Sequence, residues 1–207
     1  MTGSVTDREI DQPQPQPQPQ EKHRGAFLEM LISSAIGLVA SLVLSIEAVT
    51  LAANPDAVFS CDISAKISCG AVGVSWQSEV LGFPNAFLGL IAEAVVITVA
   101  VAALGGVKFP RWYMLVAQGV YAIGFVFAYW LFWQSFSVIG ALCPWCLLIT
   151  VTTTLVFFSL TRVNILDGNF GPGIQRKLTP ALRVGADVGI SIILIAIIAA
   201  MVIFEYI

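Results

Sequence analysis

Residues 142–161 read LCPWCLLITVTTTLVFFSLT, and this stretch decides the class of fold. It opens with a CxxC motif and continues as an apolar run that reaches the ~20 residues an α-helix needs to cross the hydrocarbon layer of a membrane. Four more apolar runs of at least this length cover residues 27–53, 84–105, 112–135 and 184–207. Because no water satisfies the backbone inside lipid, each run is predicted to be a membrane-spanning helix.

The composition supports the same class. Hydrophobic residues make up 57% of the chain, charged residues 11%, and the mean hydropathy is +0.87, which excludes an ordinary soluble domain. The first apolar run is longer than the ~7–15 apolar residues of a cleaved signal peptide, so it is expected to remain as a span. The chain is therefore predicted to be an all-α integral membrane protein with five transmembrane helices.

The basic residues predict how these helices are oriented. Nine of the ten Lys and Arg residues fall on one face of the five-span arrangement: Arg8, Lys22, Arg24, Lys108, Arg111, Arg162, Arg176, Lys177 and Arg183. Lys66 falls on the other face. The positive-inside rule then places the N-terminus in the cytoplasm and the C-terminus outside. All four cysteines are expected at the extracytoplasmic face of the cell (inner) membrane, where disulfides persist.

The polar segments divide the chain further. Residues 1–26 alternate Gln and Pro over part of their length and are predicted to be a disordered cytoplasmic tail. His23, the single histidine, falls in this tail and is therefore not expected to serve as a base or metal ligand in the bundle. The loop 54–82 is placed outside, whereas residues 162–183 carry turn signals and form a cytoplasmic connection to the fifth helix at 184–207.

Two helix faces carry a pattern. Small residues recur at every fourth position of the first span, at Ser33, Gly37, Ser41 and Ser45, and predict a seam for close helix packing. Aromatic rings crowd the third span between Tyr121 and Phe136. They fit an interfacial aromatic belt, and they equally fit a wall for a flat apolar cofactor.

The CxxC motif predicts thiol chemistry. Pro144 suits the first position of a helix, where its missing N–H needs no partner. Cys143 then becomes the N-cap residue, where the helix dipole and free N–H groups stabilise a thiolate. Cys146 lies about 4.5 Å further along the helix axis, deeper in the apolar layer. Such a pair can connect thiols at the surface with an oxidant dissolved in lipid.

The second thiol pair, Cys61 and Cys69, lies in the exterior loop. It can close into a disulfide and can also move, which favours a shuttle that delivers electrons to Cys143. Two alternatives stay open. The pair can form a purely structural disulfide, or all four cysteines can bind zinc in a membrane protein that is not an enzyme.

An ordered set of residues resembles the vitamin K epoxide reductase (VKOR) family, in particular its bacterial members that serve disulfide-bond formation. The set comprises Cys61 to Cys69, then Ser75, Asn85 and Gly89, and finally Cys143-Pro144-Trp145-Cys146. The resemblance covers about residues 27–161. It implies a four-helix bundle around a quinone, with the fifth helix outside it. It also implies that the loop pair shuttles electrons, that Cys143 and Cys146 form the active-site pair, and that Ser75 and Asn85 donate hydrogen bonds to the quinone head group.

The resemblance further implies an activity and partners. The expected enzyme is a membrane thiol-disulfide oxidoreductase that reoxidises an extracytoplasmic thioredoxin-fold, DsbA-like protein and reduces a quinone of the menaquinone or ubiquinone type. Many bacterial relatives continue into a thioredoxin-like domain, whereas this chain stops at Ile207, so a separate partner protein is expected. Thr150 stands where vertebrate members carry a tyrosine, which disfavours the alternative of epoxide reduction. No nucleic acid or metal is expected as a partner.

Two acidic residues fall inside predicted spans. Glu93 lies near the middle of the second span, where it is interpreted as a neutral acid bonded to a neighbouring helix rather than as a proton source for quinone. Glu47 lies near the outer end of the first span and is expected to reach water.

Overall fold

The structure is a computed structural model that describes residues 23–206. The part of the predicted tail before residue 23 lies outside the described residues. Five long apolar helices confirm the predicted spans: α1 (Arg24–Ala53), α3 (Ala86–Leu104), α4 (Arg111–Gln134), α5 (Pro144–Leu166) and α7 (Ala186–Tyr206). Within the described residues there is no strand, so the all-α prediction is confirmed. Three short helical elements, α2 (Cys69–Gly73), η1 (Trp76–Glu79) and α6 (Pro172–Arg183), lie in the connections.

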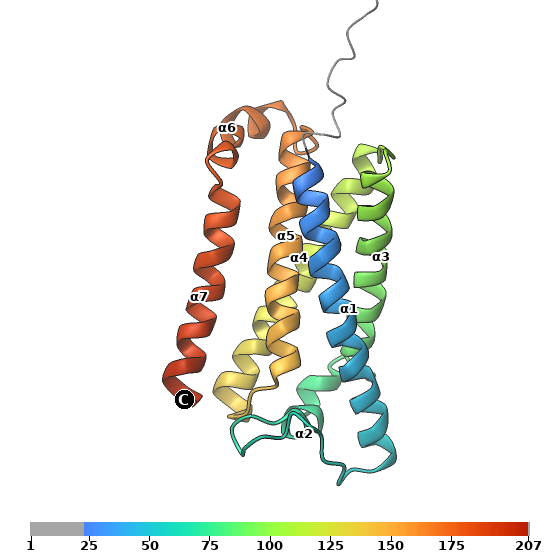
Figure 1. The fold of residues 1–207 in the computed structure, drawn as a ribbon, viewed down its shortest axis with the longest axis vertical. Helices are drawn as coiled ribbons and strands as arrows, with labels where there is room; N and C mark the ends of the chain where they lie inside the picture. The colour runs from blue at the N-terminus through green and yellow to red at the C-terminus, as the bar shows by residue number, and fades with distance from the viewer. Residues whose placement is uncertain (1–22, 207) are drawn as a thin grey trace, which may run out of the picture.

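Four of the long helices form a bundle in which α1 packs against both α3 and α5, and α4 packs against α5 (Figure 1). Their shared core is apolar and includes Met30, Ala100, Val156 and Val163. Helix α4 ends in a π-helical turn, η2 (Ser135–Ile139), and Gly140 then adopts a left-handed conformation with φ of 71°. Because this turn is so short, α4 and α5 are antiparallel neighbours.

The predicted packing seam on α1 is confirmed. Ser33, Gly37, Ser41 and Ser45 are all buried. A Cβ atom at Gly37 would lie 2.8 Å from Oε1 of Glu93, which belongs to α3. The absence of a side chain at Gly37 therefore makes room for a carboxyl group between the two helices.

Glu93 is bonded to a neighbouring helix, as predicted. The Tyr121 hydroxyl of α4 donates a hydrogen bond to Glu93 Oε2 over 3.1 Å. The carboxyl group is buried, with 3% of the residue exposed. It therefore links α1, α3 and α4 in the middle of the bundle.

The first helix starts earlier than the sequence predicted. It begins at Arg24 rather than at residue 27, and the Phe27 N–H bonds to the His23 carbonyl over 3.1 Å. His23 is buried, and its Nε2 lies 2.8 Å from Asp167 Oδ1 at the end of α5. This contact holds the first turn of α1 against the bundle, at the end opposite the cysteines.

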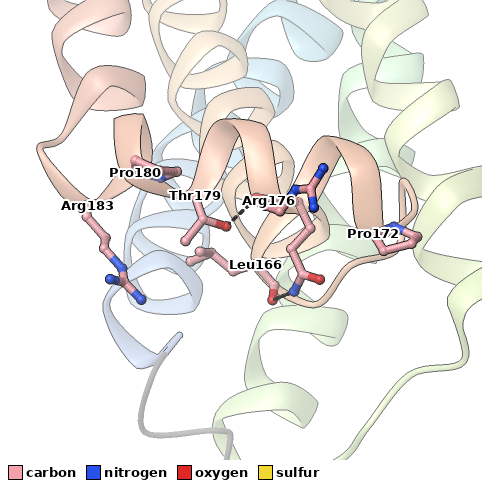
Figure 2. Close-up of a pocket in the computed structure, with 7 residues that line it drawn as sticks. Leu166, Pro172, Arg176, Thr179, Pro180 and Arg183 are labelled. Atoms are coloured by element: carbon pink, nitrogen blue, oxygen red, sulfur yellow. Dashed lines mark hydrogen bonds between the residues drawn. The ribbon is translucent and has the colours of Figure 1, made fainter.

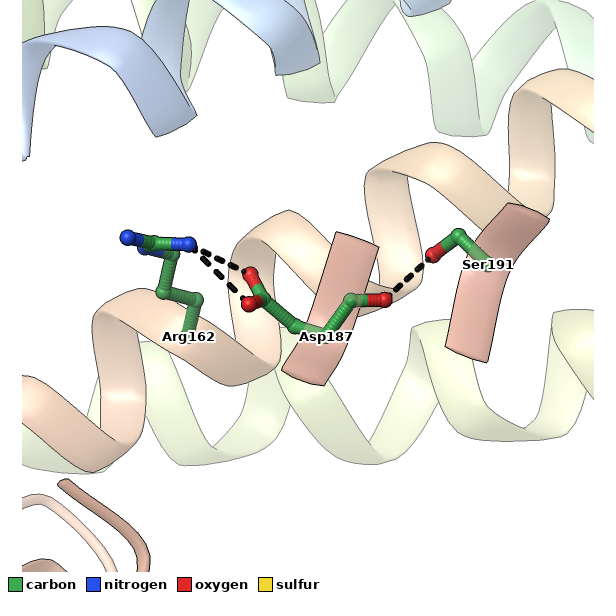
Figure 3. A network of polar contacts seen from close by, with 3 residues as sticks. All are labelled: Arg162, Asp187 and Ser191. Atoms are coloured by element: carbon green, nitrogen blue, oxygen red, sulfur yellow. Dashed lines mark hydrogen bonds and ion pairs between the residues drawn. The ribbon is translucent and has the colours of Figure 1, made fainter. Parts of the chain in front are cut away.

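Helix α7 lies beside the bundle and packs on α5 (Figure 1). Arg162 of α5 donates hydrogen bonds to both carboxylate oxygens of Asp187, at 3.0 and 2.8 Å, and Ser191 donates to the Asp187 carbonyl (Figure 3). At its other end, the Glu205 carbonyl accepts a hydrogen bond from Lys66 Nζ over 2.9 Å. The fifth helix is thus tied to the bundle at one end and to the cysteine loop at the other.

The connection between α5 and α7 contains a helix as well as the predicted turns. Helix α6 follows Gly171, and Pro172 occupies its first turn. Gln175 of α6 donates a hydrogen bond to the Leu166 carbonyl, and Arg176 and Arg183 line a surface pocket beside it (Figure 2). This amphipathic helix therefore presents basic side chains at the end of the bundle that is opposite the cysteines.

Candidate active site

The CxxC motif forms the start of α5, as predicted. Cys143 is the N-cap residue, Pro144 is the first residue of the helix, and the Cys146 N–H donates to Cys143 Sγ over 3.4 Å. The pKa of the Cys143 thiol is held below its ordinary value of 9.0 by a hydrogen bond from the Cys146 side chain and by the N–H groups of Cys146 and Trp145, against the opposing effect of burial. A thiol in this position is a good leaving group in disulfide exchange.

The loop cysteines, Cys61 and Cys69, are joined in a disulfide, whereas Cys143 and Cys146 are free thiols. The loop is closed by the side chain of Asp62. Its carboxylate accepts hydrogen bonds from the Phe59 N–H at 2.7 Å, the Ser68 hydroxyl at 2.7 Å and the Gly70 N–H at 2.9 Å.

These bonds have an electrostatic consequence. The Phe59 and Gly70 N–H groups, together with the Ser68 hydroxyl, lower the pKa of Asp62 below its ordinary value of 3.8. The carboxylate therefore stays ionised at neutral pH and keeps its three bonds.

The loop is fastened to the chain immediately before the CxxC motif. The Ser68 N–H donates to the Leu142 carbonyl over 3.0 Å, and the Leu142 N–H donates to the Lys66 carbonyl over 2.9 Å. This short parallel pairing places Cys69 Sγ 3.4 Å from Cys143 Sγ. Cys69 is thus the loop cysteine that faces the CxxC motif, an assignment that the spacing of the cysteines does not make.

The thiol cluster is shielded from solvent. Exposed fractions are 6% for Cys61, 3% for Cys69 and 1% for Cys143. Apolar side chains from α1, the loop and α5 pack around the sulfurs, among them Leu44, Phe59 and Trp145. The loop disulfide is therefore almost completely enclosed by protein in this structure.

The predicted quinone ligands, Ser75 and Asn85, lie together around η1. The Ser78 hydroxyl and N–H both donate to the Ser75 carbonyl, and the Asn85 N–H donates to the Ser78 carbonyl. The Ser75 hydroxyl donates to the Val72 carbonyl over 2.6 Å, and the Asn85 side-chain amide donates to the Gln77 carbonyl over 2.6 Å. The hydroxyl hydrogen of Ser75 is thus donated to a backbone carbonyl and is not available for a hydrogen bond to a ligand.

The side-chain oxygen of Asn85, in contrast, is available to accept a hydrogen bond from a ligand. This atom, Oδ1, is buried and finds no hydrogen-bond partner in the part of the chain that the structure describes. A buried acceptor without a partner is costly, so a ligand hydroxyl would be bound favourably there. A reduced quinone carries such hydroxyls, and in this respect the residues fit the cofactor.

Several aromatic rings of the third span pack against the fifth helix and the start of α5. Phe132, Leu142 and Ile198 form a buried cluster, and Tyr129, Phe136 and Leu147 pack against it. The cluster joins α4, α7 and the chain at the start of α5, where Leu142 directly precedes Cys143. These rings therefore pack the third span against the fifth helix, whereas the cluster around the sulfurs is formed by other side chains.

The expectation that Glu47 reaches water is wrong. The residue is 8% exposed, and its Oε1 lies 3.3 Å from Cys61 Sγ. The sequence placed Glu47 near the end of a span but contained no signal for the loop folding back over it. Only the packing of the loop against α1 brings this carboxyl group into the thiol cluster.

The Cys61–Cys69 disulfide is relevant to the alternative in which all four cysteines bind zinc. Zinc is held by thiolates, and a disulfide sulfur is not a thiolate. Cys61 and Cys69 are both in the disulfide, so two of the four sulfurs that such a site would use are not thiolates in this structure.

Comparison with known protein families matches residues 28–161 to the vitamin K epoxide reductase family. The match covers more than half of the chain and spans α1 to α5, and it includes all four cysteines. No curated protein matches the chain. The chain belongs to the vitamin K epoxide reductase family, whose members carry out disulfide and quinone redox chemistry in membranes and generally use quinones.

Proposed function

We propose that this member of the vitamin K epoxide reductase family is a quinone-dependent thiol-disulfide oxidoreductase. It reoxidises a thioredoxin-fold, DsbA-like protein outside the cytoplasm and thereby supports disulfide formation in secreted proteins. The observation that carries the proposal is the 3.4 Å contact between Cys69 of the loop disulfide and Cys143 of the CxxC motif. Sulfur atoms at this separation are placed for thiol-disulfide exchange.

The proposed relay has two exchanges. A partner dithiol reduces the Cys61–Cys69 disulfide and becomes a disulfide itself. The loop dithiol then reduces a Cys143–Cys146 disulfide through a mixed disulfide between Cys69 and Cys143, and two electrons move at each exchange. The observed combination of a loop disulfide with free thiols at Cys143 and Cys146 is the state that follows the second exchange.

The quinone, when bound, supplies the two-electron acceptor for the Cys143–Cys146 dithiol. Asn85 would hold its head group. Ser75 would act indirectly, because its hydrogen bonds with Val72 and Ser78 fix the conformation of the η1 segment. The low pKa of Cys143 favours its thiolate, while Cys146 lies one turn further into the apolar layer.

The orientation of the relay is supported by charge. Lys108, Arg176 and Arg183 lie in connections at the end of the bundle opposite the cysteines, whereas Lys66 is the one described basic residue of the cysteine loop. The positive-inside rule assigns that end to the cytoplasm. The thiol cluster then faces the exterior, where a thioredoxin-fold partner would meet it.

The proposal is tested by following the absorbance of a soluble ubiquinone or menaquinone analogue. The purified full chain is mixed with the analogue, and a reduced thioredoxin-fold protein is added. We expect the quinone to be reduced at the rate at which the partner is oxidised, and Cys146→Ala to abolish the reaction. Full turnover in Cys146→Ala, or no reduction of either analogue by the unaltered protein, would contradict the proposal.

A further inference from the structure

The relay leaves one group in the thiol cluster without a role, the carboxyl group of Glu47. It lies in the last third of α1, and its two oxygens have different surroundings. Oε1 lies 3.3 Å from Cys61 Sγ, whereas Oε2 is buried and has no hydrogen-bond partner among the described residues. A buried carboxyl group with an unsatisfied oxygen is costly to keep, so a functional reason for it is worth seeking.

The surroundings of Glu47 favour exchange of a proton rather than a fixed charge. The titratable groups that face it are Asp62 and Cys61 from the loop, with Cys143 and Cys146 from α5. All of them are acids, and within residues 23–206 Glu47 forms no ion pair. A carboxyl group with only acidic neighbours is not held in the ionised form by a cation, so it can take up a proton from a thiol.

The two loop sulfurs face different groups. Cys69 Sγ faces Cys143 Sγ, and Cys61 Sγ faces Glu47 Oε1. A disulfide sulfur carries no proton, so the contact at Cys61 becomes a proton-transfer contact only when the loop disulfide opens and Cys61 is a thiol. That situation arises in the mixed disulfide between Cys69 and Cys143. The lone histidine of the chain is bound to Asp167 at the opposite end of the bundle and cannot serve there.

We propose that Glu47 is a catalytic acid–base residue for the exchange between the loop and the CxxC motif. In the Cys69–Cys143 mixed disulfide, Glu47 removes the proton from Cys61 as Cys61 Sγ attacks Cys69 Sγ. The Cys61–Cys69 bond forms, the Cys69–Cys143 bond breaks, and its electron pair leaves on Cys143 as a thiolate. The proton ends on Glu47, which returns it to Cys61 when the loop disulfide is next opened with Cys61 as the leaving sulfur. This inference rests on the proposed relay between the two cysteine pairs.

The test follows thiol transfer inside the protein and needs no quinone. Fully oxidised full-length protein is mixed with one equivalent of dithiothreitol, quenched with acid at intervals and alkylated, and new thiols at Cys143 and Cys146 are counted by mass spectrometry. The thiols that the same treatment produces in Cys69→Ala, where dithiothreitol can reach the CxxC motif only directly, are subtracted, so that the remainder measures transfer from the loop. The variants are Glu47→Gln, which keeps the shape but cannot accept the proton, and Glu47→Asp, which keeps an acid on a shorter side chain. Glu93→Gln is the matched control, because it removes another buried carboxyl group, one that is bonded to Tyr121 in the middle of the bundle.

The pH dependence separates a chemical role from a structural one. At about pH 7 only a few per cent of an ordinary thiol is ionised, so Glu47→Gln is expected to slow transfer by about 30-fold. At about pH 9.5 most of the thiol ionises unaided, and the slowing should shrink to less than about threefold. Glu47→Asp should show the same trend with a smaller loss, and Glu93→Gln should stay within about twofold of the unaltered protein at every pH.

A loss in Glu47→Gln that is equal at both pH values, or no loss at all, would overturn the inference. Should Glu47→Gln fail to fold, the pH trend of Glu47→Asp decides in the same way. Failure of the proposed quinone-dependent function gives a different pair of results in the alkylation experiment and the absorbance assay. Thiols would then appear at Cys143 and Cys146 of the unaltered protein in this experiment, while no quinone analogue is reduced in the absorbance assay.

Discussion

At one end of the molecule Asp187 of α7 meets Arg162 of α5, whereas at the other end Glu47 of α1 meets the sulfur of Cys61. Both carboxyl groups are buried, with exposed fractions of 7% and 8%. Asp187 receives two hydrogen bonds from a cation, so its charge is compensated. Among residues 23–206, no cation forms an ion pair with Glu47, and one of its oxygens has no hydrogen-bond partner. The first arrangement suits a fixed structural contact, and the second suits a group that changes its protonation.

The largest effect on turnover is expected at the loop cysteines. Cys61→Ala or Cys69→Ala removes the shuttle, so oxidation of a protein partner should fall to background. A small dithiol can reach the CxxC motif directly in these variants and should retain measurable quinone reduction. Comparing the two reductants in the absorbance assay checks the prediction. Equal losses with both reductants would argue that the loop pair is not a shuttle.

A smaller effect is expected at Asp62, which closes the loop but does not touch the exchanging sulfurs. Asp62→Asn places an amide where the Phe59 N–H needs an acceptor, which should destabilise the closed loop by about 1 to 2 kcal/mol. Thiol transfer to Cys143 should slow by up to about tenfold. The alkylation experiment measures this rate. Asp56→Asn, in the same loop but exposed, is the control and should have no effect; equal slowing in both variants would contradict the role of Asp62.

The same bonds predict a dependence on acid. The pKa of Asp62 in the folded protein lies below its ordinary value of 3.8. Its stabilisation of the loop is therefore complete above that value and is lost as the pH falls through the lower, folded-state pKa. Limited proteolysis of the loop should accelerate only in that acidic range, and Asp62→Asn should remove the dependence.

The smallest effect on turnover is expected at the opposite end of the bundle. Asp187→Asn leaves Arg162 without its counter-charge, which should lower the free energy of unfolding by about 1 to 3 kcal/mol. Because this contact is remote from the sulfurs, quinone reduction should stay within about twofold. Thermal unfolding in detergent and the absorbance assay measure the two quantities. A loss of turnover as large as that of Asp62→Asn would show that the docking of α7 controls the thiol end.

Much of the architecture could be predicted because it depends on local properties of the chain. Apolar length predicted the five spans, the small residues of α1 predicted a packing face, and Pro144 predicted that Cys143 caps a helix. Each of these follows from the requirement that backbone groups in lipid satisfy themselves, or from the geometry of a single helix.

The finer assignments at the site could not be predicted in this way. The positions of Cys61 and Cys69 in the chain are equivalent with respect to Cys143 until Ser68 and Lys66 pair with Leu142. The burial of Glu47 also depends on the loop, because its Oε1 lies against Cys61 Sγ. Likewise, the Ser75 hydroxyl was expected to serve a ligand, but a nearby carbonyl accepts its hydrogen.

The sequence by itself determined that this chain spans a membrane with five helices, that it belongs to its family, and that it carries two pairs of thiols. Tertiary structure alone decided which sulfur meets which partner: Cys69 lies against Cys143, and Cys61 lies against Glu47. The physical reason is the distance along the chain over which each feature is determined. Span formation depends on the hydropathy of about 20 consecutive residues. The contact between Cys69 and Cys143, by contrast, joins residues that are 74 positions apart in the chain, and the contact between Glu47 and Cys61 requires the chain to fold back over 14 positions.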